Sequence, residues 1–176
     1  MSTSVMHTDE IDSLIADLAS DQWATRQHAR QALVAIGSPA AAALIKALQD
    51  HDWRVRWGAT KALGEIRDPA VPPALVRRLE DERPGIRWLA AEGLIAYERE
   101  GLAALLQALV HHSDAVWLRE GAHHVIHNLA ERDQNLHDLL RPVLVAIDDI
   151  EPAIEVPPAA QAALNALAKA TGQQDD

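Results

Sequence analysis

The chain has 176 residues and a net charge of −10, with 48% hydrophobic residues, 3% aromatic residues and no cysteine or phenylalanine. A chain of this length builds one domain with a sizeable core. That core must consist of Ala, Leu, Val and Ile, which suits closely packed helices. The composition excludes a disulfide framework. The acidic charge argues against non-specific binding to nucleic acid, which requires neutralised phosphates.

Membrane insertion and secretion are not expected either. No apolar run approaches the length of about 20 residues that spans a bilayer. The first residues, "MSTSVMHTDEID", lack both the basic start and the apolar stretch of a secretory signal. The sequence therefore predicts a cytoplasmic protein with no membrane association.

The predicted elements in chain order form a repeat. One helix over residues 9–20 is followed by helix pairs over residues 21–50, 52–81, 83–112 and 114–150, and by a capping helix over residues 155–171. An arginine recurs about every 30 residues in the first helix of each pair, with an alanine three residues later and Leu or Ile seven residues later. These arginines are Arg26, Arg56, Arg87 and Arg119.

Apolar residues at these offsets form one stripe along a helix. The sequence thus predicts an all-α fold, an α-α superhelix of about ten helices in antiparallel pairs. We expect a single right-handed solenoid domain over residues 1–176, with the two lone helices covering its ends. Asp21, Asp52 and Asp114 are predicted N-caps, and Pro142 predicts a kink or break in the last second helix.

One segment identifies the type of repeat. The stretch "DWRVRWGATKALGEIRDPAVPPALVRRLED", residues 52–81, closely resembles the HEAT-like repeats often grouped with the phycobilisome lyases. The other three pairs follow the same motif with gaps. The resemblance implies that Arg26, Arg56, Arg87 and Arg119 form a structural ladder, which ties neighbouring repeats together through acidic residues or carbonyl groups.

Tryptophans occupy unusual positions on these helices. On a helical wheel, Trp57 and Trp88 lie almost opposite the core stripe, in an outward row that Ile95 extends. Large aromatic residues at outward positions predict a partner-binding surface of Trp57, Trp88 and Ile95. The alternative is that these rings lie over Lys and Arg stems or fill gaps between helices. Trp23, Trp53 and Trp117 are predicted to be structural.

A histidine cluster in "REGAHHVIHNL", residues 119–129, is the one group of residues in the sequence that resembles a metal-binding or catalytic site. His123 and His127 have the i, i+4 spacing of a helical two-histidine metal site, and Glu120 shares their face. The sequence shows no third ligand from another segment. We therefore expect a solvated polar face and no bound metal or cofactor.

The function predicted from these features is a non-enzymatic protein–protein interaction scaffold or adaptor. Its partner is a protein of unknown identity or a second copy of the chain, and no nucleic acid is expected. The resemblance leaves two alternatives open. One is an accessory subunit of a bilin lyase-type complex, and the other is a HEAT-like nucleic-acid-binding or DNA-repair protein.

Overall fold

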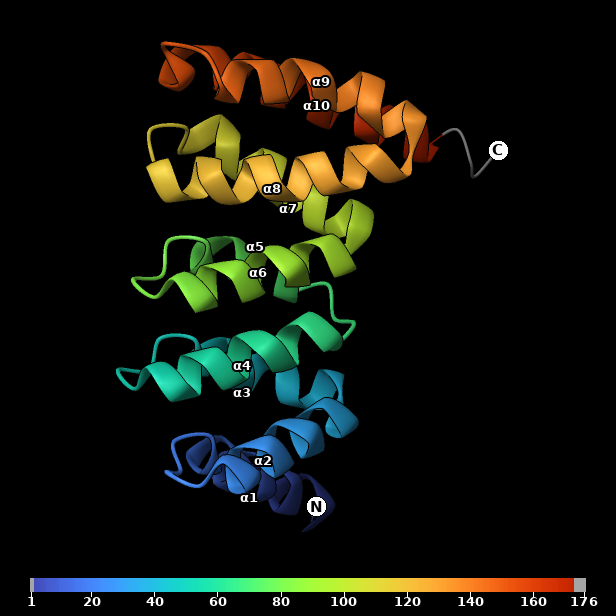
Figure 1. Ribbon diagram of the computed structural model, residues 1–176. Coiled ribbons are helices and arrows are strands. Elements are labelled where there is room, and N and C mark those ends of the chain that lie inside the picture. Colours follow the sequence, from blue (N-terminus) through green and yellow to red (C-terminus); the bar gives the residue numbers. More distant parts are fainter. Residues whose placement is uncertain (1, 173–176) are drawn as a thin grey trace. The chain divides into compact units, whose positions relative to one another are not determined.

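Ten helices make up the described part of the chain (Figure 1). The computed structural model describes residues 2–172, with side chains described from residue 8 to residue 170. The helices are α1 (Ser2–Asp17), α2 (Trp23–Ile36), α3 (Ser38–Ala47), α4 (Trp53–Glu65), α5 (Val71–Arg78), α6 (Pro84–Ala96), α7 (Glu98–His111), α8 (Val116–Arg132), α9 (Gln134–Ile147) and α10 (Pro152–Gly172). Residues 2–172 contain no strand, so the predicted all-α fold is confirmed. None of the helices in this range is long and apolar enough to cross a membrane.

The chain divides into two compact units, residues 1–93 and residues 94–176, and the division falls inside α6. We call them unit 1 and unit 2. The single domain expected over residues 1–176 stays a prediction, and each unit is described by itself below.

Unit 1 consists of two layers of helices. α2, α4 and α6 follow one another in one layer, and α3 and α5 lie behind them (Figure 1). Its core is built from the leucines of the repeat, among them Leu33, Leu44, Leu63, Leu75 and Leu79, none of which has measurable exposure. The apolar stripes of the sequence therefore do face the interior of this unit.

Glycines let α4 and α6 approach each other closely. A Cβ added to Gly64 would lie 3.2 Å from the Cα of Gly93, and one added to Gly93 would lie 2.8 Å from a methyl group of Leu75. At this crossing the two backbones are nearly in contact, because neither residue has a side chain. The crossing fixes how far apart the outward side chains of α4 and α6 can lie.

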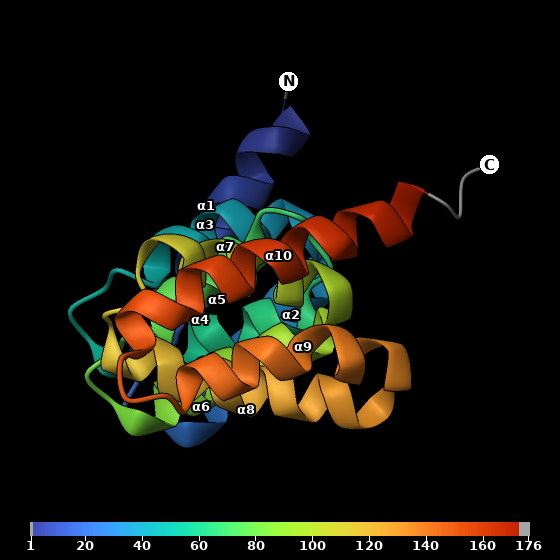
Figure 2. The same cartoon turned by 90° about the horizontal axis from the view of Figure 1, so that it is seen from above.

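Unit 2 is a ring of four helices. α7 packs on α8, α8 on α9, α9 on α10, and α10 on α7. Figure 2 shows α9 and α10 running beside each other. The ring is joined by polar contacts as well: Arg99 Nη2 donates to the Leu167 carbonyl at 3.1 Å, and Ser113 Oγ donates to the Ala153 carbonyl at 3.0 Å.

Helix ends were predicted less well than helix cores. Asp52 does cap α4, since its carboxylate accepts from the Arg54 N–H at 2.9 Å. The predicted caps Asp21 and Asp114 are wrong, because α2 and α8 begin one residue later and their N-caps are Gln22 and Ala115. Of the kink or break expected at Pro142, the break is wrong, because α9 continues through it from Gln134 to Ile147, and the kink stays a prediction.

Candidate functional site

The ladder arginines bind the turns that precede their own helices. In each case Nη1 of the guanidinium donates to backbone carbonyls five or six residues earlier. The bonds are Arg26 to Ser20 O (2.6 Å) and Asp21 O (3.0 Å), Arg56 to Asp50 O (3.0 Å) and His51 O (3.1 Å), Arg87 to Asp81 O (3.0 Å) and Glu82 O (3.4 Å), and Arg119 to Ser113 O (2.5 Å). The four positions thus share a carbonyl contact, and their importance for stability stays a prediction.

Arg56 also reaches the turn of the following helix pair. Its Nε donates to Asp81 at 2.9 Å and its Nη2 donates to Glu82 at 2.8 Å. Asp81 is only 4% exposed. Burial by itself raises the pKa of Asp81. Hydrogen bonds from Arg56 and from the Arg83 N–H, together with the charges of Arg56 and Arg78, outweigh this and hold the pKa below its ordinary value.

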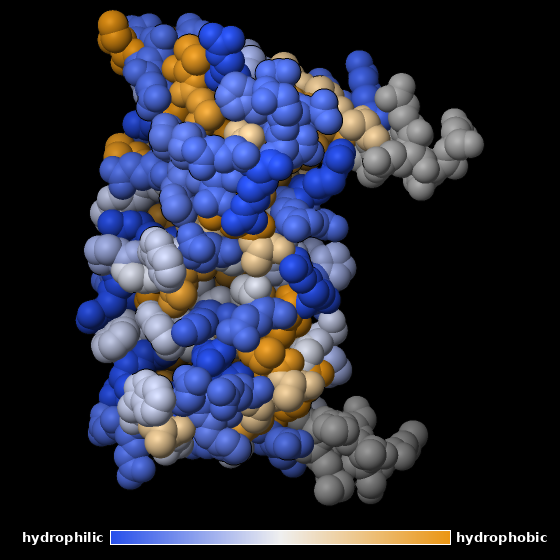
Figure 3. Space-filling model, turned by 45° about the vertical axis from the view of Figure 1, so that its right-hand side comes forward, coloured by the Kyte–Doolittle hydropathy of each residue, from blue (hydrophilic) through white to orange (hydrophobic). Residues whose placement is uncertain are grey.

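Four tryptophans lie on the α2, α4 and α6 layer of unit 1, near the N-terminal ends of these helices. Trp23 is 69% exposed, Trp88 58% and Trp53 41%, whereas Trp57 is partly buried. We call Trp23, Trp53, Trp57 and Trp88 the tryptophan face. In Figure 3, side chains of intermediate hydropathy, drawn nearly white, gather at the left over this layer.

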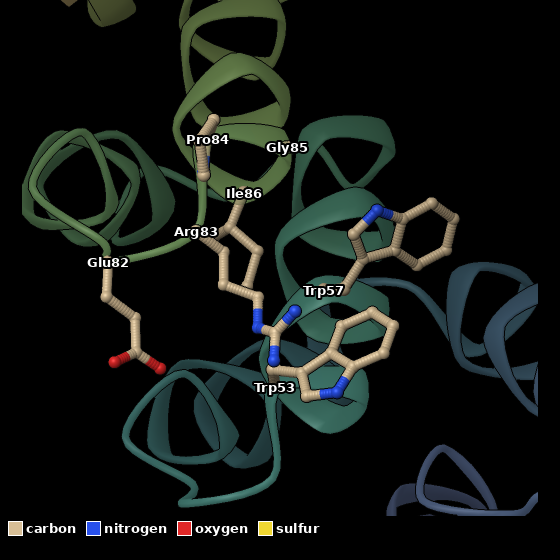
Figure 4. A pocket seen from close by; sticks show the side chains of 7 residues that line it. All are labelled: Trp53, Trp57, Glu82, Arg83, Pro84, Gly85 and Ile86. Atoms are coloured by element: carbon tan, nitrogen blue, oxygen red, sulfur yellow. The ribbon is translucent and has the colours of Figure 1, made fainter.

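Trp53 and Trp57 separate two recesses of this layer. The α4/α6 recess, of about 560 Å³, is lined by both tryptophans together with Glu82, Arg83, Pro84, Gly85 and Ile86 (Figure 4). The α2/α4 recess, of about 290 Å³, is lined by the same two tryptophans and by Leu18, Trp23, Arg26, Gln27, Arg30, Arg54 and Gly58. The pair Trp53 and Trp57 is therefore a wall that both recesses share.

Cations of the chain itself lie over this wall. The Arg83 guanidinium carbon lies 4.5 Å from the centre of the Trp53 ring, and Figure 4 shows the side chain extending from the start of α6 to that ring. Lys61 Nζ lies 5.1 Å from the centre of the Trp57 ring. The alternative considered for these rings, that they lie against Lys and Arg side chains, thus describes part of their surroundings.

Ile95 does not belong to an exposed surface, which corrects one prediction. It is only 4% exposed. The helical wheel considered burial against the second helices alone. Within unit 1 the first helices also pack side by side, as the close crossing of Gly64 and Gly93 shows, and a wheel of one helix omits such packing.

Trp57 and Trp88 occupy equivalent positions on α4 and α6, and the surface that they were predicted to share stays a prediction. Among the described residues the two rings make no stacking contact, and Trp88 lines neither recess. Trp57 shares both recesses with Trp53, a residue predicted to be structural. The i, i+4 spacing of Trp53 and Trp57 was the signal that places both on one side of α4.

The histidine cluster lies on α8 in unit 2. The rings of His123 and His127 stack with centroids 6.0 Å apart. His127 Nε2 lies 3.2 Å from a Glu131 carboxylate oxygen, and His123 Nε2 lies 3.7 Å from an Asp148 carboxylate oxygen. Glu120 and His123 both line a shallow recess at the start of α8. Within the side chains described, no group of three or more His, Cys, Asp or Glu residues is placed to hold a metal ion.

Comparisons with known proteins support the repeat character of the chain. The family model of HEAT repeats matches residues 11–95. Among solved structures, the chain is similar to an engineered protein, with 17% identity and a TM-score of 0.39 over 90% of this chain and 98% of the other. That likeness carries no argument about function. No curated protein matches the sequence. Residues 11–95 are therefore similar to HEAT repeats, and the described part of the chain is all-α.

Proposed function

We propose that this chain is a non-enzymatic interaction scaffold or adaptor, which binds a protein partner through the tryptophan face of unit 1. One observation carries the proposal: two adjacent recesses on one helix layer share a wall of two tryptophans. HEAT repeats commonly serve as protein-interaction scaffolds, and residues 11–95, which match their model, include the whole tryptophan face.

The chemistry of the face favours binding over packing. Trp23 and Trp88 leave more than half of their surface exposed, so burying them against a partner removes a large apolar area from water. Tryptophan is enriched among residues that dominate binding energy, and such residues work best in recesses that exclude water. The face offers both the aromatic residues and the recesses.

The partner in this proposal is another protein, and a second copy of the chain is one form of it. The bilin lyase accessory subunit and the DNA-repair protein rest on resemblance alone and stay alternatives.

The proposal is tested by comparing two double variants. Trp53→Ser with Trp88→Ser removes two exposed rings of the tryptophan face. Val116→Ser with Trp117→Ser is the matched control, because both residues are exposed at the start of α8 in unit 2. Each protein is immobilised, exposed to a lysate of the source organism, and the bound proteins are identified by mass spectrometry.

We expect a protein that the wild type and the control capture and the tryptophan-face variant loses. Sedimentation of the three purified proteins shows whether this protein is a second copy. Equal capture and equal sedimentation for all three proteins would contradict the proposal.

A further inference from the structure

The two recesses also indicate what kind of segment fits the tryptophan face. We infer that the occupant is an extended acidic segment of the partner, which inserts one apolar side chain into each recess and places its carboxylates against the arginines around them. This inference rests on the proposed function and adds the chemistry of the partner.

The spacing of the recesses matches an extended chain. They lie on opposite sides of Trp53 and Trp57, one between α2 and α4 and the other between α4 and α6. Packed helices lie about 8–10 Å apart. An extended segment in the polyproline II conformation advances about 3.1 Å per residue with three residues per turn, so residues three apart point the same way and lie about 9 Å apart. Two apolar side chains at positions i and i+3 can therefore enter consecutive recesses.

The charges around the recesses favour carboxylates, although the chain as a whole is acidic. The charged residues that line the two recesses are Arg26, Arg30, Arg54, Arg83 and one acid, Glu82. Glu82 is already paired with Arg56 at 2.8 Å. Arg30 is paired with Glu65, and Arg54 is paired with Asp21 and Asp52. Among the described residues, the positive charge at the recesses that has no carboxylate partner is therefore that of Arg26 and Arg83.

Two of these arginines have no carboxylate partner among the described residues. Within the described part of the chain, Arg26 contacts carbonyl oxygens and no carboxylate, and Arg83 makes no ion pair. Arg30, in contrast, is only 7% exposed and is already paired with Glu65 at 2.6 Å. Arg26 and Arg83 therefore carry positive charge that a partner's carboxylates can neutralise.

The same geometry argues against two other occupants. A basic segment is repelled, because Arg83 and Lys61 already lie over the rings of Trp53 and Trp57. Single-stranded nucleic acid binds by stacking its bases on open aromatic rings. Both rings of the wall have a cation of this chain over one face, which leaves less open ring surface for a base to stack on.

A random library of 12-residue peptides displayed on phage tests the inference with the intact chain. Selection against the wild type, after depletion on Trp53→Ser, should enrich peptides with a net negative charge and two apolar residues three positions apart. Enrichment of basic peptides, of apolar residues seven positions apart as on a helix, or of no peptide at all would overturn the inference.

A selected peptide is then synthesised with a fluorescent label, and fluorescence anisotropy measures its dissociation constant. Comparing this constant between variants shows how much charge contributes to binding. Arg83→Ala should weaken binding about fivefold, as for an exposed ion pair, and the difference should shrink at high salt. Arg77→Ala is the matched control, because Arg77 is exposed on α5 and lines neither recess. Equal binding by both variants and the wild type would contradict the inference, as would tighter binding of a single-stranded oligonucleotide of equal charge.

The outcomes separate this inference from the proposed function. Suppose that capture of a protein depends on Trp53 and Trp88, but that this protein binds through a basic or helical segment. The proposed function then stands, and the inference of an acidic segment is wrong. If capture does not depend on the tryptophans, both the proposed function and the inference of an acidic segment are wrong.

Discussion

The starts of α4 and α8 occupy the same place in the repeat and are built differently. At α4, Asp52 caps the helix, Trp53 and Trp57 point away from the core, and Arg56 is held by two carboxylates as well as two carbonyls. At α8, Ala115 provides no side-chain cap. Val116 and Glu120 stand where the tryptophans stand in α4, and the Arg119 hydrogen bond described goes to the Ser113 carbonyl.

The comparison separates the repeated framework from what is added to it. Both starts have the ladder arginine with its carbonyl contact, and both helices bury the alanine three residues beyond it. Tryptophans at these two positions, and carboxylates bonded to the ladder arginine, are found at α4 and not at α8. We conclude that the framework sets the fold, while the outward positions of unit 1 carry the proposed binding surface.

The largest expected effect comes from removing the arginine that differs most between the two helices. Arg56→Ala should lower the free energy of unfolding by about 3 kcal/mol, because it leaves the buried Asp81 with fewer partners. Arg119→Ala should cost about 1 kcal/mol, because it removes a contact to a carbonyl alone. Urea denaturation measures both, and equal losses would show that the carboxylates around Arg56 add nothing.

The carboxylate of Asp81 should make stability depend on pH. Its pKa in the folded chain lies below the unfolded value of about 3.9, so the unfolded chain takes up this proton first as the pH falls. Its stabilising contribution is therefore complete above about pH 5 and is lost as the pH falls below about 4. Asp81→Asn should be less stable at neutral pH and should lose less stability on acidification. Parallel pH profiles for the variant and the wild type would argue against this role.

The tryptophan face should contribute less to stability than Arg56. Trp57→Ser with Trp88→Ser should lower the free energy of unfolding by about 1 kcal/mol, since Trp88 is exposed and Trp57 is only partly buried. Urea denaturation of this double variant and of Arg56→Ala, measured under the same conditions, compares the two losses of stability. A loss as large as that of Arg56→Ala would assign the two rings to packing.

The smallest effect is expected at the histidines of α8. His123 and His127 have carboxylates of Asp148 and Glu131 near them, and the residues described provide no group of three metal-binding side chains. Calorimetric titration of the chelator-treated wild type with zinc should give the same heat as the same titration of the His123→Ala variant. A stoichiometric heat that this variant abolishes would reveal a metal site.

Much of the fold could be predicted because core residues repeat. Leu33 and Leu63 occupy equivalent positions and are both fully buried, so helical periodicity locates the core. The N-caps were harder to predict, because several polar residues precede each helix and the backbone conformation determines which of them is the N-cap. Asp52 accepts from the Arg54 N–H, whereas Asp21 lies one residue before the N-cap Gln22.

The candidate site could be predicted in part. The wheel gave Trp57 and Trp88 an outward direction, and Trp88 is indeed exposed. It also gave this direction to Ile95, which is buried, because a wheel describes one helix and omits the neighbours in its layer. The recesses could not be predicted at all, since they depend on how α2, α4 and α6 pack beside one another.

The central claim is that outward tryptophans of unit 1 bind the partner. Its most direct test is the dissociation constant of the captured protein, measured for the wild type and for Trp57→Ser with Trp88→Ser. The account predicts binding at least about tenfold weaker in the variant, as expected when residues that dominate an interface are removed. An unchanged dissociation constant in a folded variant would contradict it.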